Sequence, residues 1–188
     1  ERKILQKIEK MILEKKYFQS FSKVILLFCL ALSAITSHAE KKLEQIIQEP
    51  INQLHETLIN IMVISNSTSF EERYEYLEPI IDKNFDMELI SKVVLGRFWK
   101  SINEENKIKF IDLFKQLTIS TYVSRFNSFN KQIFKNISIT QLKENRFLVK
   151  TEFKKTEGKP ISFNYIVQEN DQKWRIISVI ANGINDLS

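Results

Sequence analysis

Apolar residues recur with the period of a helix in the first half of the chain and with the period of a strand in the second half. From residue 41 to about residue 66, apolar side chains stand three or four positions apart, which places them on one face of a helix. The clearest run is Ile51, Leu54, Leu58, Ile61 and Met62. Pro50 precedes this run and is expected to kink or restart the helix.

Three more helices are expected before the pattern changes. The polar run 66–69 interrupts the first helix and can cap the second, which is amphipathic and covers residues 70–85. Asp86 caps a short third helix, which Gly96 ends. Asn103 caps a fourth helix that extends to about Phe129, and Glu104 follows it in the first turn, where the helix dipole favours an anion.

From about Ile133 the apolar positions alternate with polar ones. Four segments show this period of two, at residues 133–142, 146–155, 161–169 and 173–181. The connections between them are short enough for antiparallel hairpins. The predicted fold class is therefore α+β, with N-terminal helices packed on a C-terminal four-stranded antiparallel twisted sheet.

The charge distribution argues against a nucleic-acid partner. The chain has 188 residues and a formal net charge of +5. Residues 1–39 hold seven of the 28 Lys and Arg residues and three of the 23 Asp and Glu residues, so most of the excess lies there. The remainder is almost neutral and lacks the basic footprint that DNA or RNA requires.

The N-terminal segment has the pattern of an export signal. Lys15, Lys16 and Lys23 form a basic region after Met11, and the apolar stretch 24–35 follows. Small residues then stand at positions 37 and 39, which predicts cleavage after Ala39. The apolar stretch is shorter than the ~20 residues of a spanning helix. We therefore expect residues 1–39 to be upstream residues plus a cleavable signal, residues 40–188 to be a single domain, and the mature protein to be periplasmic.

The residues offer little for catalysis or metal binding. Cys29 is the only cysteine and lies in the expected signal, so a thiolate nucleophile and a cofactor held by cysteine are not expected. Of the two histidines, only His55 lies in the expected mature chain, where we place it at the surface or its boundary. Glu71, Glu72, Glu75 and Glu78 have helical spacing and are best explained by a solvated helix face. No catalytic site, cofactor or metal site is predicted.

Residues 76–126 carry a resemblance to a known family. Phe85–Asp86 precedes the short helix, Leu95–Gly96–Arg97–Phe98–Trp99 ends it, and Phe110, Phe114 and Tyr122 lie on the next helix. This pattern closely resembles the MlaC / toluene-tolerance family of periplasmic phospholipid-binding proteins, which assist ABC transporters. Tyr165, Trp174 and Gly183 match later family positions. The chain departs from the pattern at Ser178, where the family usually has an aspartate, and in Gly183–Ile184–Asn185, where the family has a Gly–Val–Ser triplet. The family also continues beyond the point where this chain stops.

The resemblance implies lipid transport rather than enzymatic activity. Family members carry a phospholipid across the periplasm between an outer-membrane MlaA-type lipoprotein complex and an inner-membrane Mla-type ABC transporter, which maintains outer-membrane lipid asymmetry. The acyl tails would enter an apolar cavity between the sheet and the helices. Three alternatives remain open: a binder of another apolar ligand such as a hopanoid-type lipid, a small α+β roll enzyme, and an assembly module with a solid core.

The expected cavity gives a set of candidate lipid-binding residues. Arg97 and Tyr122 are expected at the mouth of the pocket. The lining is expected to come from one face of the sheet and from the fourth helix: Phe114, Leu117, Ile137, Ile139, Val149, Phe153, Phe163, Tyr165, Val167 and Val179.

Overall fold

The structure is a computed structural model that describes residues 40–182 and 184–185. The chain divides into two compact units, residues 1–44 and residues 45–188, and the fold described below is that of the second. The expected signal, with Cys29 and the cleavage position after Ala39, lies outside the described residues, as does Gly183.

The helices follow the sequence pattern closely. Residues 40–63 are helical and are called the first helix here. Pro50 lies inside this helix and is buried, so the helix continues through the proline and does not restart after it. Then come α2, α3, the short 3₁₀ helix η1 and α4, which cover Phe70–Asn84, Met87–Leu95, Gly96–Lys100 and Glu104–Arg125.

Local chemistry fixes the helix ends. Ser69 accepts a hydrogen bond from the Glu72 backbone, and the Glu72 carboxylate accepts one from the Ser69 backbone, which forms a capping box. Asp86 and Asn103 cap α3 and α4 as expected. Gly96 follows α3 with φ of +52°, a conformation that favours glycine. The fourth helix ends at Arg125 rather than near Phe129, and residues 126–132 form a connecting loop.

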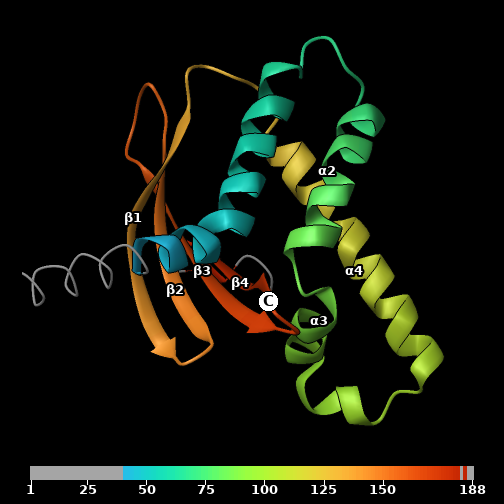
Figure 1. Cartoon of the computed structure of the whole chain (residues 1–188). Helices are drawn as coiled ribbons and strands as arrows, with labels where there is room; N and C mark the ends of the chain where they lie inside the picture. Colours follow the sequence, from blue (N-terminus) through green and yellow to red (C-terminus); the bar gives the residue numbers. More distant parts are fainter. Residues whose placement is uncertain (1–39, 183, 186–188) are drawn as a thin grey trace, which may run out of the picture. The chain divides into compact units, whose positions relative to one another are not determined.

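The sheet is an antiparallel meander, confirming the predicted fold class. Its strands lie in the order β1-β2-β3-β4-β5, and β5 is a two-residue addition at the edge. Figure 1 shows the part of the first helix that belongs to the second unit, residues 45–63, lying against the sheet, with α2 and α4 beyond it. The strand bounds are Ile133–Lys143, Arg146–Lys154, Ile161–Asn170, Lys173–Ala181 and Ile184–Asn185.

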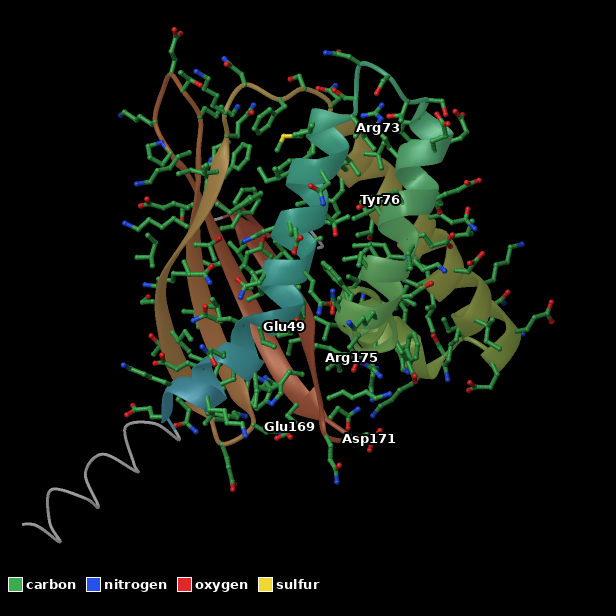
Figure 2. The ribbon with its side chains drawn as sticks, turned by 45° about the horizontal axis from the view of Figure 1, so that its top comes forward. Glu49, Arg73, Tyr76, Glu169, Asp171 and Arg175 are labelled. Carbon is green, nitrogen blue, oxygen red and sulfur yellow. The ribbon has the colours of Figure 1, made fainter. Side chains whose placement is uncertain are left out.

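Charged side chains mostly cover the outside of this arrangement. Figure 2 shows Glu169, Asp171 and Tyr76 among the side chains that surround the ribbon. Arg73 is an exception, because it is buried and donates hydrogen bonds to the backbone oxygens of Ser69 and Val123, at 3.2 and 3.4 Å. It therefore ties the start of α2 to the end of α4.

Candidate functional site

One face of the sheet is apolar and turns toward the first helix. The pairing register places Ile139, Val149, Tyr165 and Val179 side by side in one row across four strands. Val149 and Val179 have no exposed surface, and Tyr165 has 1%. Alternation along β2 and β3 puts further apolar residues on the same face, because successive side chains of a strand point to opposite sides.

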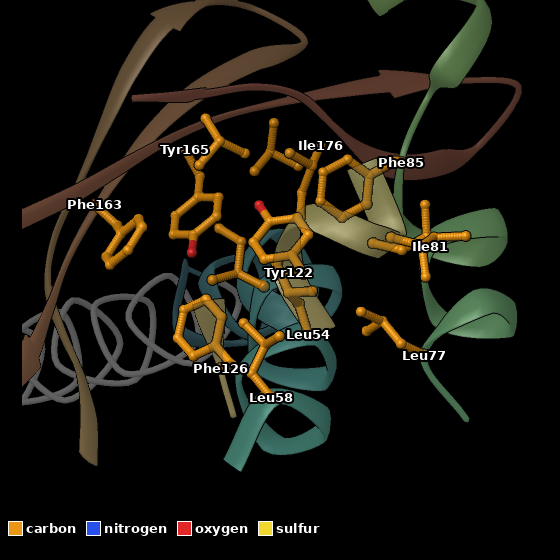
Figure 3. Close-up of a cluster of buried hydrophobic side chains, with 14 of the residues drawn as sticks. Leu54, Leu58, Leu77, Ile81, Phe85, Tyr122, Phe126, Phe163, Tyr165 and Ile176 are labelled. Atoms are coloured by element: carbon orange, nitrogen blue, oxygen red, sulfur yellow. The ribbon is translucent and has the colours of Figure 1, made fainter. Parts of the chain in front are cut away.

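The first helix covers this face with an apolar stripe. Ile51, Leu54, Leu58 and Ile61 are fully buried, and they have the spacing of one helix face. Figure 3 shows Leu54 and Leu58 in the same buried cluster as Phe126, Phe163 and Tyr165. Over this part of the interface the protein's own side chains fill the space between helix and sheet.

Four phenylalanine rings at one end of the interface form a cluster, which we call the aromatic wall: Phe126, Phe134, Phe153 and Phe163. Ring centroids of Phe134 and Phe153 are 4.7 Å apart, those of Phe126 and Phe153 are 5.5 Å apart, and those of Phe134 and Phe163 are 6.1 Å apart. These tilted and edge-on arrangements are typical of packed aromatic side chains. The wall joins the end of α4 to three neighbouring strands.

A hollow of about 350 Å³, the end hollow, lies at the ends of the strands beside the aromatic wall. Among its lining residues, Phe126, Phe153 and Phe163 are buried and are called its floor, whereas the cationic Arg125 and Lys155 are exposed and are called its rim. The hollow therefore combines an apolar surface with positive charge. Its other lining residues are Met62, Ser128, Gln132, Ile161, Ala181 and Asn182.

A second hollow of about 410 Å³, the edge hollow, lies between the first helix and the edge strand β1. Phe134 of the aromatic wall lines it, and so does Gln132, which also lines the end hollow. The two hollows are therefore neighbours on either side of the same loop and wall. The rest of the edge hollow is lined by His55, Glu56, Ile59, Asn60, Phe129 and Ile133.

His55 lies in this apolar interior, which corrects the expectation of a surface or boundary position. Its side chain is buried, its ring stacks on Phe134 at a centroid distance of 3.8 Å, and a 2.9 Å hydrogen bond joins its Nε2 to the Tyr165 hydroxyl. Burial lowers the pKa of His55 to about 3, because the charged imidazolium is poorly solvated there. The imidazole is therefore neutral at neutral pH.

Most of the predicted lining residues come together on the inner face. Ile139, Val149, Phe153, Phe163, Tyr165, Val167 and Val179 belong to the core or pack against it. Phe153 and Phe163 also line the end hollow. Phe114 is half-buried on α4, where its ring stacks on Phe110 at 5.8 Å and packs against the core.

Two predicted lining residues lie on the outer surface instead. Leu117 is 61% exposed, because α4 buries Thr118, Ile119 and Tyr122 on a different face. Ile137 is 49% exposed. The pairing of β1 with β2 skips Ile137 at a β-bulge, so it leaves the inward-facing series that Ile139 rejoins.

Neither of the two residues expected at the pocket mouth lines the end hollow or the edge hollow. Tyr122 is 5% exposed and contacts the rings of Phe85 and Phe126, at centroid distances of 6.4 and 6.0 Å. It is therefore an interior residue. Arg97 is exposed on η1, with its guanidinium 5.0 Å from the centre of the Phe98 ring, and it lines neither hollow.

Several residues of the hollows are not among those predicted from the sequence. Phe134 begins the alternation of the first strand, and that signal alone could have identified it. Met62 and Phe126 are the last apolar residues of two predicted helices. The sequence around each residue does not show that the fold brings them to the same hollow. Arg125 and Lys155 carry no signal, because nothing in their sequence surroundings distinguishes them from other surface cations.

The site can bury hydrocarbon but holds few reactive groups. Within the described residues, no group of three or more His, Cys, Asp or Glu side chains could hold a metal ion. In the same part of the chain, no helix has the length and apolar character to cross a bilayer. The buried polar pair His55–Tyr165 is enclosed by aromatic and aliphatic side chains, which is the environment of a binding site for an apolar ligand.

Comparisons with known proteins agree with this geometry. A family model described as "MlaC protein" matches residues 52–188. A comparison with curated protein sequences finds no match. Among solved structures, a phospholipid-binding protein from Ralstonia solanacearum, determined in complex with a phospholipid, has a similar fold with a TM-score of 0.65. The two sequences are 16% identical, and the similarity covers 76% of this chain and 79% of the other.

Proposed function

The chain belongs to the MlaC protein family, and from that premise we propose that it binds a two-chain phospholipid, with the acyl tails between the first helix and the sheet. The mature protein carries this lipid through the periplasm and needs a partner at each membrane to load or release it. The proposed partners are an outer-membrane MlaA-type lipoprotein complex and an inner-membrane Mla-type ABC transporter. The shuttle maintains outer-membrane lipid asymmetry.

The observation that carries the proposal is the pair of adjacent hollows on either side of the aromatic wall. Volumes of about 350 and 410 Å³ fall in the lower part of the ~300–1,000 Å³ range of small-molecule pockets. A two-chain lipid is larger than such ligands, so it needs both hollows and the space between them. The rings of Phe126, Phe134 and Phe153 stand in that space and must move when lipid enters.

Opening also requires the first helix and the edge strand to separate. The Asn136 amide on β1 donates hydrogen bonds to Gln48 and Asn52 of the helix, at 2.5 and 3.0 Å. Because these amides are partly exposed, water can replace the bonds at a cost of only about 1 kcal/mol each. The acyl tails then cover the apolar surface that the separation of helix and strand uncovers.

Energetics favour a passive carrier. Each methylene group exposed to water costs ~0.8 kcal/mol, so a carrier must enclose the tails almost as well as a bilayer does. A site that bound the lipid much more strongly could not release it. The direction of transport must then come from an energy-consuming partner such as the ABC transporter.

A binding protein fits the interior better than an enzyme does. A roll enzyme with a conical pocket needs a polar centre such as an Asp–His pair. The partner of His55 is the hydroxyl of Tyr165, and burial holds the pKa of His55 near 3, so it is a weak base at neutral pH. The same pair is suited to satisfying two polar groups inside an apolar interior.

Native mass spectrometry of the purified protein, followed by extraction and identification of any bound lipid, tests the proposed function. We expect a co-purifying phospholipid with two acyl chains. A polycyclic lipid would assign the site to hopanoid-type ligands. A protein that stays empty after expression and after incubation with phospholipid vesicles would refute phospholipid binding.

A further inference from the structure

The rim of the end hollow carries two cationic side chains. Arg125 at the end of α4 and Lys155 after the end of β2 are both among the residues that line it, and none of the described lining residues is Asp or Glu. Both residues are exposed. Long cationic side chains of this kind can lie over apolar surface while their charged ends stay in water.

The rim is built from segments that hydrogen bonds hold together. The Thr156 hydroxyl, next to Lys155, donates to the Asn130 backbone oxygen at 2.6 Å. Across the hollow, the Asn182 backbone donates to the Ser162 backbone oxygen at 2.8 Å, and the Ser162 backbone donates to the Asn182 side-chain oxygen at 3.1 Å. The Thr156 bond fixes the hairpin that carries Lys155 to the loop after α4, and the two bonds between Ser162 and Asn182 fix β3 to the end of β4.

Charge and shape together indicate the chemistry of the ligand group. Arg125 and Lys155 are both cationic, and Arg125 also interacts with another group of the protein. The rim therefore offers an anion the ammonium of Lys155 and the remaining N–H donors of Arg125. Phe126, Phe153 and Phe163, the buried floor, line the same hollow, so the matching ligand is an amphiphile with an anionic head.

We propose that Arg125 and Lys155 bind the phosphate group of the lipid whose tails pass over the aromatic wall; this inference rests on the proposed function. A guanidinium has five N–H donors, so Arg125 can contact a phosphate and a protein group at the same time. The ammonium of Lys155 binds phosphate as a compact charge. Charge-assisted hydrogen bonds of this kind are about twice as strong as neutral ones.

A free phosphate ion has the same head-group chemistry, but the apolar floor favours the lipid. Inorganic phosphate would leave the hollow beside Phe153 and Phe163 filled with water, whereas acyl chains would fill it with hydrocarbon. The recognition predicted here is therefore for a phosphate that is attached to hydrocarbon.

A competition between two lipids that differ only in the phosphate-containing head group tests the inference. The protein is incubated with vesicles that contain phosphatidylglycerol and diacylglycerol with identical acyl chains, and the bound lipids are quantified by mass spectrometry. The test variant is Arg125→Gln/Lys155→Gln. The control is Lys150→Gln/Lys173→Gln, which changes the net charge equally at two exposed lysines that line neither hollow.

We expect the natural protein and the control to bind more phosphatidylglycerol than diacylglycerol. In the test variant, the ratio of bound phosphatidylglycerol to bound diacylglycerol should be about tenfold lower. An unchanged ratio in the test variant would overturn the inference while leaving phospholipid binding intact. A natural protein that takes up no phospholipid would refute the proposed function as well.

Titration calorimetry with inorganic phosphate alone separates the two sources of the anion. We expect no saturable binding at millimolar phosphate. Saturable binding that the test substitutions abolish, together with an unchanged lipid ratio, would assign the rim to a free anion and overturn the inference.

Discussion

His55 illustrates how a single residue can link the interior to the behaviour of the whole protein in acid. In the folded state its pKa is about 3, because burial disfavours the charged ring, whereas in the unfolded chain it is ~6.5. Below pH ~6.5 the unfolded chain therefore binds a proton that the folded protein does not bind. The free energy of unfolding must fall as the pH drops from ~6.5 toward 3.

We predict that this loss depends on His55. Urea unfolding at pH 7.5 and at pH 5.5 should show that the natural protein loses about 1 kcal/mol more than a His55→Phe variant between these two pH values. Phenylalanine keeps the stacking surface toward Phe134 and removes the titrating group. If both proteins lose the same stability, His55 does not titrate as its burial implies.

Phe163 and Ile137 provide a matched pair for testing the apolar site. The sequence predicts that both line the cavity, but Phe163 lies at the end hollow and Ile137 is exposed. We predict that Phe163→Asp abolishes co-purification of lipid, since a charge there would have to be buried against acyl chains, and that Ile137→Asp leaves lipid occupancy unchanged.

Because Phe163→Asp can also weaken the fold, a second variant fills the hollow without adding charge. Ala181 lines the end hollow, and Ala181→Leu should reduce the amount of bound lipid while the protein remains folded by circular dichroism. Full lipid occupancy in both Phe163→Asp and Ala181→Leu would show that the end hollow does not hold the tails.

Among the helices and strands, the ends of helices depend on local chemistry, whereas a β-bulge depends on how two strands pair. The sequence predicts helix starts at the polar run 66–69, at Asp86 and at Asn103. The residues that cap these helices are Ser69, Asp86 and Asn103, because a cap needs only a side chain and the backbone three residues later. The bulge at Ile137 depends on how β1 pairs with β2. That pairing is a long-range property, so the alternation of residues 133–142 alone could not reveal it.

Gly96 is the residue on which the end of α3 depends. Its φ is +52°, and an added Cβ would meet no atom within 4 Å. The penalty for Gly96→Ala is therefore backbone strain alone, which should lower the free energy of unfolding by about 1–3 kcal/mol.

Urea unfolding measures this change in stability. The control is Val93→Ala, on the exposed surface of the same helix, which should change the free energy of unfolding by less than about 0.5 kcal/mol. Equal effects of the two substitutions would mean that the backbone at Gly96 is not strained.

At the scale of the whole molecule, lipid binding requires the first helix to move relative to the sheet. Asn52 and Asn136 contact each other across this interface, at 3.0 Å. We predict that Asn52→Cys/Asn136→Cys, combined with Cys29→Ser and joined by a short bifunctional thiol reagent, stops the protein from taking lipid out of vesicles. Lipid extraction is measured before and after cross-linking.

A control for the reagent uses two cysteines on elements that need not separate. Glu78 and Lys115 join α2 to α4 through a 3.1 Å ion pair, and the cross-linked Glu78→Cys/Lys115→Cys variant should still extract lipid. If cross-linking Asn52→Cys/Asn136→Cys leaves extraction unchanged, the helix and the edge strand do not have to part.

The arrangement of layers could be predicted from the sequence, whereas the position of the hollows could not. Changes of hydrophobic period locate the helices and strands, and short connections fix an antiparallel meander. The row from Ile139 to Val179 follows from that topology. The hollows depend on where the loop 126–132 and the ends of β2 and β4 meet in space, so the positions of Arg125, Lys155 and Phe134 become clear only in three dimensions.

The most direct measurement of where the tails lie is photo-cross-linking with a phospholipid that carries a diazirine in one acyl chain, followed by mapping of the labelled peptides. We predict labels at the aromatic wall and along the first helix, most strongly at Phe126, Phe153 and Ile59. Labels confined to exposed apolar residues such as Phe98, Leu117 and Ile137 would contradict it, because they would place the lipid on the outer surface.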